Sequence, residues 1–265
     1  MSEWRGIRIA LAALILTLCV PLAAWADIVV SPLTIEVAAS PTQTGSGTFQ
    51  VRNAGTSQEQ VTVSLSGYSL GPDGALEIRQ DHRSLAPSLE FSPVTFSLEP
   101  EEKVLVTFHF RAPAESGDHW AIFFVEGSAV TPVAETSGQV QTTVGVKVRY
   151  GVKVIQRDPA ATRSGVIDSM DLLRVDPPQV LIRFENTGTS VLRKATGRVE
   201  VRGVSGALLV EIALEEFTTL PGGTRELVAA IPTEGLTRPG EYQALCIIDF
   251  GGAYLVAGEL QFSLK

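Results

Sequence analysis

The chain has 265 residues and a formal net charge of −8 at pH 7. Its 21 basic residues are outnumbered by 29 acidic ones and never cluster, so no nucleic acid is expected as a partner. After Asp27 no apolar segment approaches the roughly 20 residues that span a bilayer, so we expect no integral membrane segment in the mature chain.

The first residues have the pattern of an export signal. Arg5 and Arg8 precede an apolar run from Ile9 to Val20, and Ala24-Trp25-Ala26 forms a small-residue cleavage site before Asp27. This pattern predicts a secretory signal peptide over residues 1–26. The mature product is then expected in the periplasm, with the cell surface as the alternative.

The cysteines bear on how the exported chain is stabilised. Cys19 would leave with the signal peptide, and Cys246 lies in the apolar run Ala244 to Ile248. A single cysteine forms no internal disulfide, so the mature chain must rely on its hydrophobic cores. We therefore expect Cys246 to be a buried, small hydrophobic residue.

Short runs of alternating apolar and polar residues fill the chain after Asp27. They are separated by Gly, Pro, Asn and Ser, and no amphipathic helix interrupts them. This spacing predicts an all-β protein built from sandwiches. The first seven expected strands are Ile28 to Val37, Gly47 to Asn53, Gln60 to Tyr68, Leu89 to Phe96, Val104 to Arg111, Trp120 to Glu126 and Thr142 to Ile155, with Gly127 to Gln141 as a loop.

The pattern begins again after Pro159. A second set of seven strands is expected at Gly165 to Leu173, Val180 to Glu185, Lys194 to Arg202, Leu208 to Phe217, Arg225 to Ile231, Glu241 to Ile248 and Ala253 to Ser263. The two halves also share phrases, since FQVRNAGTSQ at Phe49 resembles IRFENTGTSV at Ile182. Matching turns in a fixed order predict two tandem immunoglobulin-like β-sandwich domains, at residues 27–158 and 159–265.

In the stretch from Thr142 to Ile155, apolar residues alternate with small or cationic residues without interruption. Its apolar side chains are Val144, Val146, Val148, Tyr150, Val152 and Val154. At about 3.3 Å per residue, fourteen residues span roughly 46 Å, which is more than twice the usual strand length. The apolar face must be covered either by the core of its own domain or by another chain, and the pattern leaves both alternatives open.

No arrangement of residues predicts catalysis or metal binding. Gly67 to Gly71 matches G-x-S-x-G, but a nucleophile such as Ser69 needs a strand-to-helix turn, and here the string leads into a loop. The three histidines, His82, His109 and His119, lie on strands or turns without a ligand at a chelating spacing. We therefore expect no enzyme activity, no cofactor and no metal.

Three phrases in order resemble the PapD-like periplasmic pilus chaperones. They are Val29-Val-Ser-Pro-Leu-Thr34, Phe91-Ser-Pro-Val-Thr-Phe-Ser-Leu-Glu-Pro100 and Val148-Arg-Tyr-Gly-Val-Lys-Val-Ile-Gln-Arg157. The resemblance covers the first domain well and the second by position and general fold. It implies a chaperone that completes an unfinished β-rich pilus or surface subunit by donor-strand complementation through a long seventh strand.

The resemblance also implies which residues meet the client. They are Val144, Val146, Val148, Tyr150 and Val152 along the strand, with Lys153 at the lysine position that binds the carboxylate of the client's last residue. The family's arginine position falls at Ile35, which cannot make that contact. An outer-membrane usher is an optional further partner. The alternative function is a secreted structural or adhesive tandem module that binds a surface protein through its loops.

Overall fold

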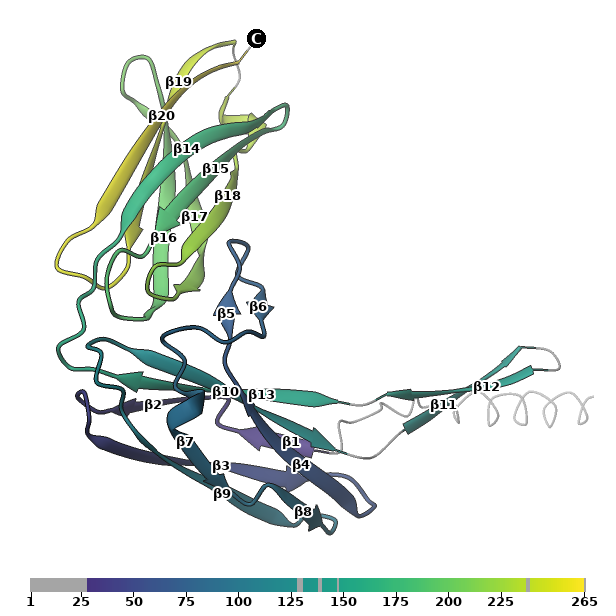
Figure 1. Ribbon diagram of the computed structural model, residues 1–265. Helices are drawn as coiled ribbons and strands as arrows, with labels where there is room; N and C mark the ends of the chain where they lie inside the picture. Colours follow the sequence, from purple (N-terminus) through teal and green to yellow (C-terminus); the bar gives the residue numbers. More distant parts are fainter. Residues whose placement is uncertain (1–27, 128–130, 138–139, 147, 237–238, 265) are drawn as a thin grey trace, which may run out of the picture.

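The computed structural model of the chain describes residues 28–127, 131–137, 140–146, 148–236 and 239–264. The predicted signal peptide, residues 1–26, lies outside the described residues. Figure 1 shows two β-sandwiches in tandem, joined by a short connection. The predicted fold class, all-β with two sandwiches, is confirmed.

The first sandwich packs a four-stranded sheet, β1-β3-β9-β7, against a five-stranded sheet, β2-β13-β10-β4-β8. The bounds of these strands are β1 Ile28–Ser31, β2 Thr34–Ala38, β3 Thr44–Asn53, β4 Glu59–Ser66, β7 Leu89–Ser92, β8 Thr95–Leu98, β9 Lys103–Arg111, β10 His119–Gly127 and β13 Arg149–Arg157. A small hairpin of β5 (Ser69–Leu70) and β6 (Leu76–Glu77) and a 3₁₀ turn, η1 (Ala86–Ser88), lie between β4 and β7.

Two strands that the sequence predicted as continuous are each divided by a proline. The predicted strand Ile28 to Val37 separates at Pro32 into β1 and β2, which belong to different sheets. The predicted strand Leu89 to Phe96 separates at Pro93 in the same way. Proline has no backbone N–H, so it interrupts the ladder at the point where the chain crosses between sheets.

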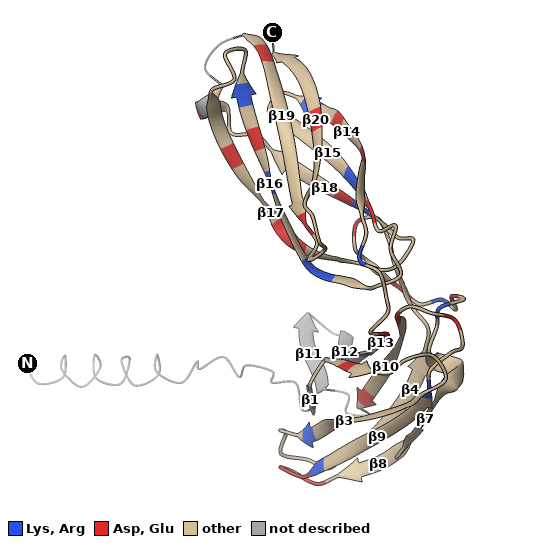
Figure 2. Ribbon diagram, turned by 90° about the vertical axis from the view of Figure 1, so that its left-hand side faces the viewer, with Lys and Arg blue, Asp and Glu red and all other residues tan. Residues whose placement is uncertain are grey.

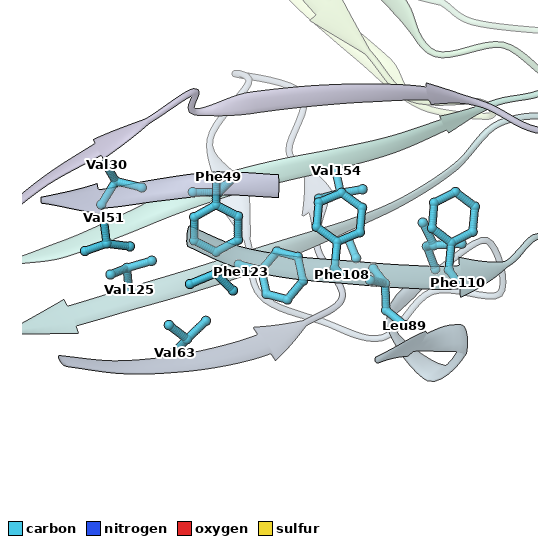
Figure 3. Packing of buried hydrophobic residues seen from close by; sticks show 14 of the residues in the cluster. Val30, Phe49, Val51, Val63, Leu89, Phe108, Phe110, Phe123, Val125 and Val154 are labelled. Atoms are coloured by element: carbon cyan, nitrogen blue, oxygen red, sulfur yellow. The ribbon is translucent and has the colours of Figure 1, made fainter. Parts of the chain in front are cut away.

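Aromatic rings fill the core of the first sandwich. The Phe123 ring lies 5.3 Å from that of Phe49, 5.0 Å from that of Phe91 and 5.6 Å from that of Phe108, measured between centroids. Figure 3 shows Phe49, Phe108 and Phe123 with valines of the facing sheets. Val154 of β13 belongs to the same core and is completely buried. The inner face of β13 is thus part of a private core.

The predicted long strand from Thr142 to Ile155 is two strands with different partners, so this prediction was wrong. Within the described residues, β12 (Val140–Val146) pairs with β11 (Thr131–Ser137) alone, in a hairpin that projects from the first sandwich (Figure 1). β13 pairs with β10 and β2 inside the sandwich. The predicted loop Gly127 to Gln141 therefore contains a strand. The alternation of apolar and polar side chains indicates extended backbone, but it does not indicate which strand pairs with it.

The second sandwich contains all seven strands predicted for it. Its sheets are β14-β15-β18 and β17-β16-β19-β20. The bounds are β14 Val166–Val175, β15 Pro178–Glu185, β16 Leu192–Gly203, β17 Leu208–Thr219, β18 Thr224–Ala230, the 3₁₀ turn η2 Thr233–Gly235, β19 Gly240–Asp249 and β20 Val256–Leu264. Cys246 is buried in this core, as expected, and burial raises the pKa of its thiol to about 12.

The phrases shared by the two halves form the same structural motif. The Asn53 side-chain amide donates to the Ser57 and Leu98 carbonyls at 2.7 and 3.0 Å, and its oxygen accepts from the Gly55 amide at 2.9 Å. Asn186 repeats this pattern, with its oxygen accepting from the Gly188 amide at 3.0 Å. Both asparagines are completely buried. A buried amide whose donors and acceptor are all satisfied fixes the same turn in both domains.

Candidate functional site

One edge of β13 is covered along only part of its length. The Lys153 amide donates to the Leu33 carbonyl at 3.0 Å, so the backbone groups of Lys153 face β2. Backbone groups of alternate residues in a strand point to the same edge, which puts those of Gly151 and Arg149 on this edge as well. The ladder with β2 begins at Lys153, paired with Thr34, and runs on to Arg157. Within the described residues, no strand lies beside Gly151 on this edge.

The predicted client-binding side chains fall into three groups. Val152 is completely buried in the core of its own sandwich, so the expectation that it meets another chain is corrected. Tyr150 is half-buried and packs against that core, whereas Val148 is 42% exposed. Val144 and Val146 lie on β12, and their side chains are outside the described residues. Burial therefore decreases steadily from Val152 towards Val148.

Lys153 lies on the opposite face of β13, which is turned towards the domain junction. Its ammonium nitrogen is 6.0 Å from the centroid of the Tyr68 ring. Burial lowers the pKa of this ammonium, and the positive charge of Arg193 lowers it further. No carboxylate within the described part of the chain forms an ion pair with Lys153. A half-buried cation of this kind is suited to receive an anion from outside.

The cation next to Lys153 comes from the second domain, which sequence reasoning missed. Ile35, at the family's arginine position, is in register with Val154 and packs against the core of the first sandwich. Arg193 of β16 instead reaches the junction, where it pairs with Glu36 of β2. No local signal could have found Arg193, because it is 40 residues from Lys153 in the sequence and in another domain.

The domains are joined by a buried carboxylate at the end of β13. Asp118 Oδ2 accepts hydrogen bonds from Arg157 Nη1 at 2.6 Å, the Ser190 hydroxyl at 3.0 Å and the Val191 amide at 2.8 Å. Its Oδ1 accepts from the Asp158 amide at 3.0 Å. These partners come from both domains and the linker, so one side chain ties all three together.

An apolar cluster lies beside this carboxylate. Its buried members are Tyr68, Trp120, Ile122, Phe124 and Ile155 of the first domain with Val191 and Leu220 of the second. The Trp120 indole N–H donates to the Tyr68 carbonyl at 2.8 Å, which satisfies its only polar group. The β5–β6 hairpin adds a further contact, because the Pro72 carbonyl accepts from the Glu226 amide at 2.7 Å. Several contacts of different kinds thus hold one domain arrangement.

The G-x-S-x-G string does not form a nucleophile elbow. Ser69 is in the β5–β6 hairpin, and its hydroxyl donates to Glu77 Oε2 at 3.3 Å. Across the described ranges, no group of three His, Cys, Asp or Glu side chains could hold a metal ion. The same ranges contain no helix that is long and apolar enough to cross a bilayer.

Comparison with known proteins places the fold. No family model and no curated protein matches the chain. A solved chaperone–tip adhesin complex of CFA/I fimbriae biogenesis contains a chain with a TM-score of 0.50 and 8% identity, covering 90% of this chain and 99% of that one. The class 5 fimbriae chaperone CfaA gives a TM-score of 0.49 and 9% identity, with 90% and 99% covered. The YadV chaperone gives 0.47 and 13%, with 89% and 100% covered.

The similarity to the chain of the chaperone–tip adhesin complex, at 8% identity, shows the fold alone. The chain has the two-sandwich architecture of PapD-like fimbrial chaperones, as the resemblance in its sequence implied. Identities of 8 to 13% carry no information about its client.

Proposed function

We propose that the chain is a periplasmic, non-enzymatic chaperone or assembly factor, and that a β-rich pilus or surface subunit adds a strand to the open edge of β13. The observation that carries this proposal is the position of the Gly151 and Arg149 backbone groups beyond the beginning of the β2 ladder. An uncovered edge offers main-chain hydrogen bonds to any extended segment, which is the basis of strand addition.

Side chains along this edge would select the client. Val148 is exposed, and Val144 and Val146 continue the alternation into the projecting hairpin. Pockets in the client for these alternate valines would supply specificity, with Tyr150 at the rim of the core. Val152 is assigned to the domain's own core.

Lys153 would bind the carboxylate at the end of the client chain. Lys153 is a half-buried cation on the junction face. The family's arginine position is occupied by Ile35, and Arg193 supplies the positive charge beside Lys153 instead. Charge-assisted hydrogen bonds to a carboxylate are about twice as strong as neutral ones, so this contact would set the position of the client strand.

The proposal places the mature chain, residues 27–265, in the periplasm after cleavage of residues 1–26. The two sandwiches would be the domains at residues 27–158 and 159–265. A solved chaperone–tip adhesin complex of CFA/I fimbriae biogenesis contains a chain of this fold.

A proline at Gly151 tests strand addition directly. The Gly151 N–H points to the open edge and away from β10, so Gly151→Pro removes an edge donor without breaking the β10 ladder. Gly151→Ala is the matched control, because it retains the N–H and meets the same side-chain atom, Ile122 Cδ1, at 2.9 Å. The measurement is the amount of subunit that co-purifies from the native envelope, identified by mass spectrometry.

We expect Gly151→Pro to reduce capture at least tenfold, because the lost hydrogen bond and the bulk of the proline ring both oppose pairing. Gly151→Ala should stay within about twofold of the parent chain. Equal capture by the two variants would show that the main-chain edge plays no part in binding. If the parent chain captures only surface proteins that are already fully folded, the alternative function as an adhesive module is favoured.

Exchange of Val148 for arginine tests the side chains of the edge. Since Val148 is exposed, Val148→Arg should leave the thermal midpoint within about 2 °C and lower capture about tenfold. Val204→Arg is the control, at an 86% exposed valine in the second domain. If Val148→Arg lowers the thermal midpoint and Val204→Arg does not, Val148 stabilises the domain and is not assigned to client binding.

A further inference from the structure

Four of the ten residues that line a small pocket at the domain junction are cationic. It has a volume of about 200 Å³, and its charged lining residues are Arg157 at the end of β13, Arg163 in the linker, Arg193 and Lys194 of β16, and Asp249 at the end of β19. Four cations thus face one carboxylate in a chain whose net charge is −8. Figure 2 shows cationic segments at the end of the second domain that is turned towards the first.

Two of the cations already have anionic partners outside the lining. Arg157 contacts Glu36 and Asp118, and Arg193 contacts Glu36. These contacts hold both guanidinium groups in place at the side of the pocket, and each still has N–H groups beyond those that the ion pairs use. The positions of the two arginines are therefore set before any ligand arrives.

The other two cations have no carboxylate partner within the described residues. Arg163 donates to the Gly251 carbonyl at 2.9 Å, which uses one of its five N–H groups. Lys194 is exposed and has a φ of 58°, in the left-handed region that residues other than glycine seldom adopt. Arg163 and Lys194 therefore bring to the pocket two positive charges that no ion pair within the described residues compensates.

Hydrogen bonds fix the walls of the pocket. The Ser164 and Tyr254 hydroxyl oxygens are 3.3 Å apart, and Arg163 reaches the Gly251 carbonyl, so the linker is tied to the turn after β19. Asp249 Oδ1 accepts from the Gly251 amide at 2.8 Å, which turns this oxygen towards its own turn. A held shape lowers the ordering cost of binding.

We propose that this junction pocket binds an oxyanion, either a free phosphate or the carboxylate of a peptide terminus. Guanidinium groups match the paired oxygens of both, and the volume accommodates one such group with a few waters, each occupying about 30 Å³. The site goes beyond the proposed function, since it shares Arg193 with the proposed client anchor but includes neither the open edge of β13 nor Lys153. Its cations come from β13, the linker and β16, so the anion would join the two domains.

Inorganic phosphate is the first probe, titrated into the full mature chain by calorimetry at constant ionic strength. The double variant Arg163→Gln/Lys194→Gln removes the two cations without carboxylate partners and leaves Arg157 and Arg193 with theirs. Lys103→Gln/Arg111→Gln is the matched control, because both residues are exposed on β9 in the first sandwich. Lys153→Gln is a second control, because it removes the proposed client anchor and leaves the pocket lining unchanged.

We expect saturable phosphate binding that weakens at least tenfold in the pocket double variant and less than twofold in the two controls. Phosphate should also raise the thermal midpoint of the parent chain and not that of the pocket variant. No saturation by the parent chain, or equal binding by the pocket variant, would overturn the site. A loss only in Lys153→Gln would overturn it too and assign the anion to the client anchor.

A pair of peptides distinguishes the two sources of the anion. A peptide with a free terminal carboxylate that competes with phosphate, while its amidated form does not, identifies a chain terminus. If neither peptide competes and phosphate still saturates, the ligand is a free phosphate. Both results support an oxyanion site, whereas the binding of both peptides with equal affinity contradicts it.

Discussion

The last strands of the two sandwiches, β13 and β20, carry the same alternation in different surroundings. β20 pairs with β19 in one continuous register, from Ile248 with Val256 to Gly240 with Leu264. β13 pairs with β10 from Arg149 to Gln156, but it pairs with β2 only from Lys153 onward. β20 is the edge strand of its sheet, whereas β13 is an inner strand whose second partner covers only part of its length.

This difference shows that length and alternation do not identify a binding strand. Three parts of β13 have three environments: Val152 and Val154 lie in a core, Arg157 lies in the domain junction, and Gly151 lies beside an open edge. The function of each part follows from its neighbours. Substitutions in one part of β13 at a time therefore test how the environment of each part differs from that of β20.

The largest effect is expected in the core part of β13. Val154→Asp places a carboxylate without a partner in a fully buried site, which should lower the free energy of unfolding by at least about 3 kcal/mol. Val256→Asp, at a partly buried position of β20, should cost less than half as much. Urea denaturation of both variants measures the difference, and equal costs would remove the distinction between the two strands.

A smaller effect is expected at the junction end of β13. Asp118→Asn loses the charge that Arg157, Ser190 and Val191 share, and should lower the free energy of unfolding by about 1.5–3 kcal/mol. The domains should also separate more often, which speeds tryptic cleavage after the exposed Arg163 of the linker.

Asp168→Asn is the control for this substitution, because Asp168 is an exposed aspartate of β14. It should leave both the free energy of unfolding and the rate of cleavage after Arg163 unchanged. If Asp118→Asn behaves in the same way as this control, the junction carboxylate does not hold the domains together.

The smallest effect is expected in the pH dependence of the same junction. The hydrogen bond from Arg157 holds the pKa of Glu36 below the usual 4.5, and the charges of Arg157 and Arg193 lower it further. A carboxyl whose folded pKa is depressed stabilises the fold above its unfolded pKa, and loses this contribution as the pH falls through the folded value. Glu36 is 37% exposed, so its contribution should be about 1 kcal/mol or less.

Comparison of the parent chain with Glu36→Gln measures this contribution. The difference in free energy of unfolding between the two should be present at pH 6 and shrink as the pH falls below 4.5. A difference that stays constant down to pH 3 would mean that the Glu36 ion pairs do not stabilise the junction.

Much of the fold could be predicted because its signals are local. The period of two identified the strands of the second sandwich, and the repeated Asn53 and Asn186 turns revealed two related domains. The divisions at Pro32 and Pro93 could have been read from the missing donor of proline. The end of β12 and the beginning of β13 could not, because alternation continues through that point.

The candidate site was only partly predictable. Lys153 and the exposed Val148 were named from the family resemblance of the strand, whereas Arg193, Asp118 and the junction pocket were missed. Each of the missed features combines residues from both domains.

The amino-acid sequence by itself determined the strands, the turns and the tandem arrangement, since these depend on side-chain alternation and on interactions between near neighbours. The tertiary structure decided which part of β13 is sealed and which is open, and which cations gather at the junction. These properties depend on contacts between residues far apart in the chain, and the free energy of such contacts is set only when the two domains come together.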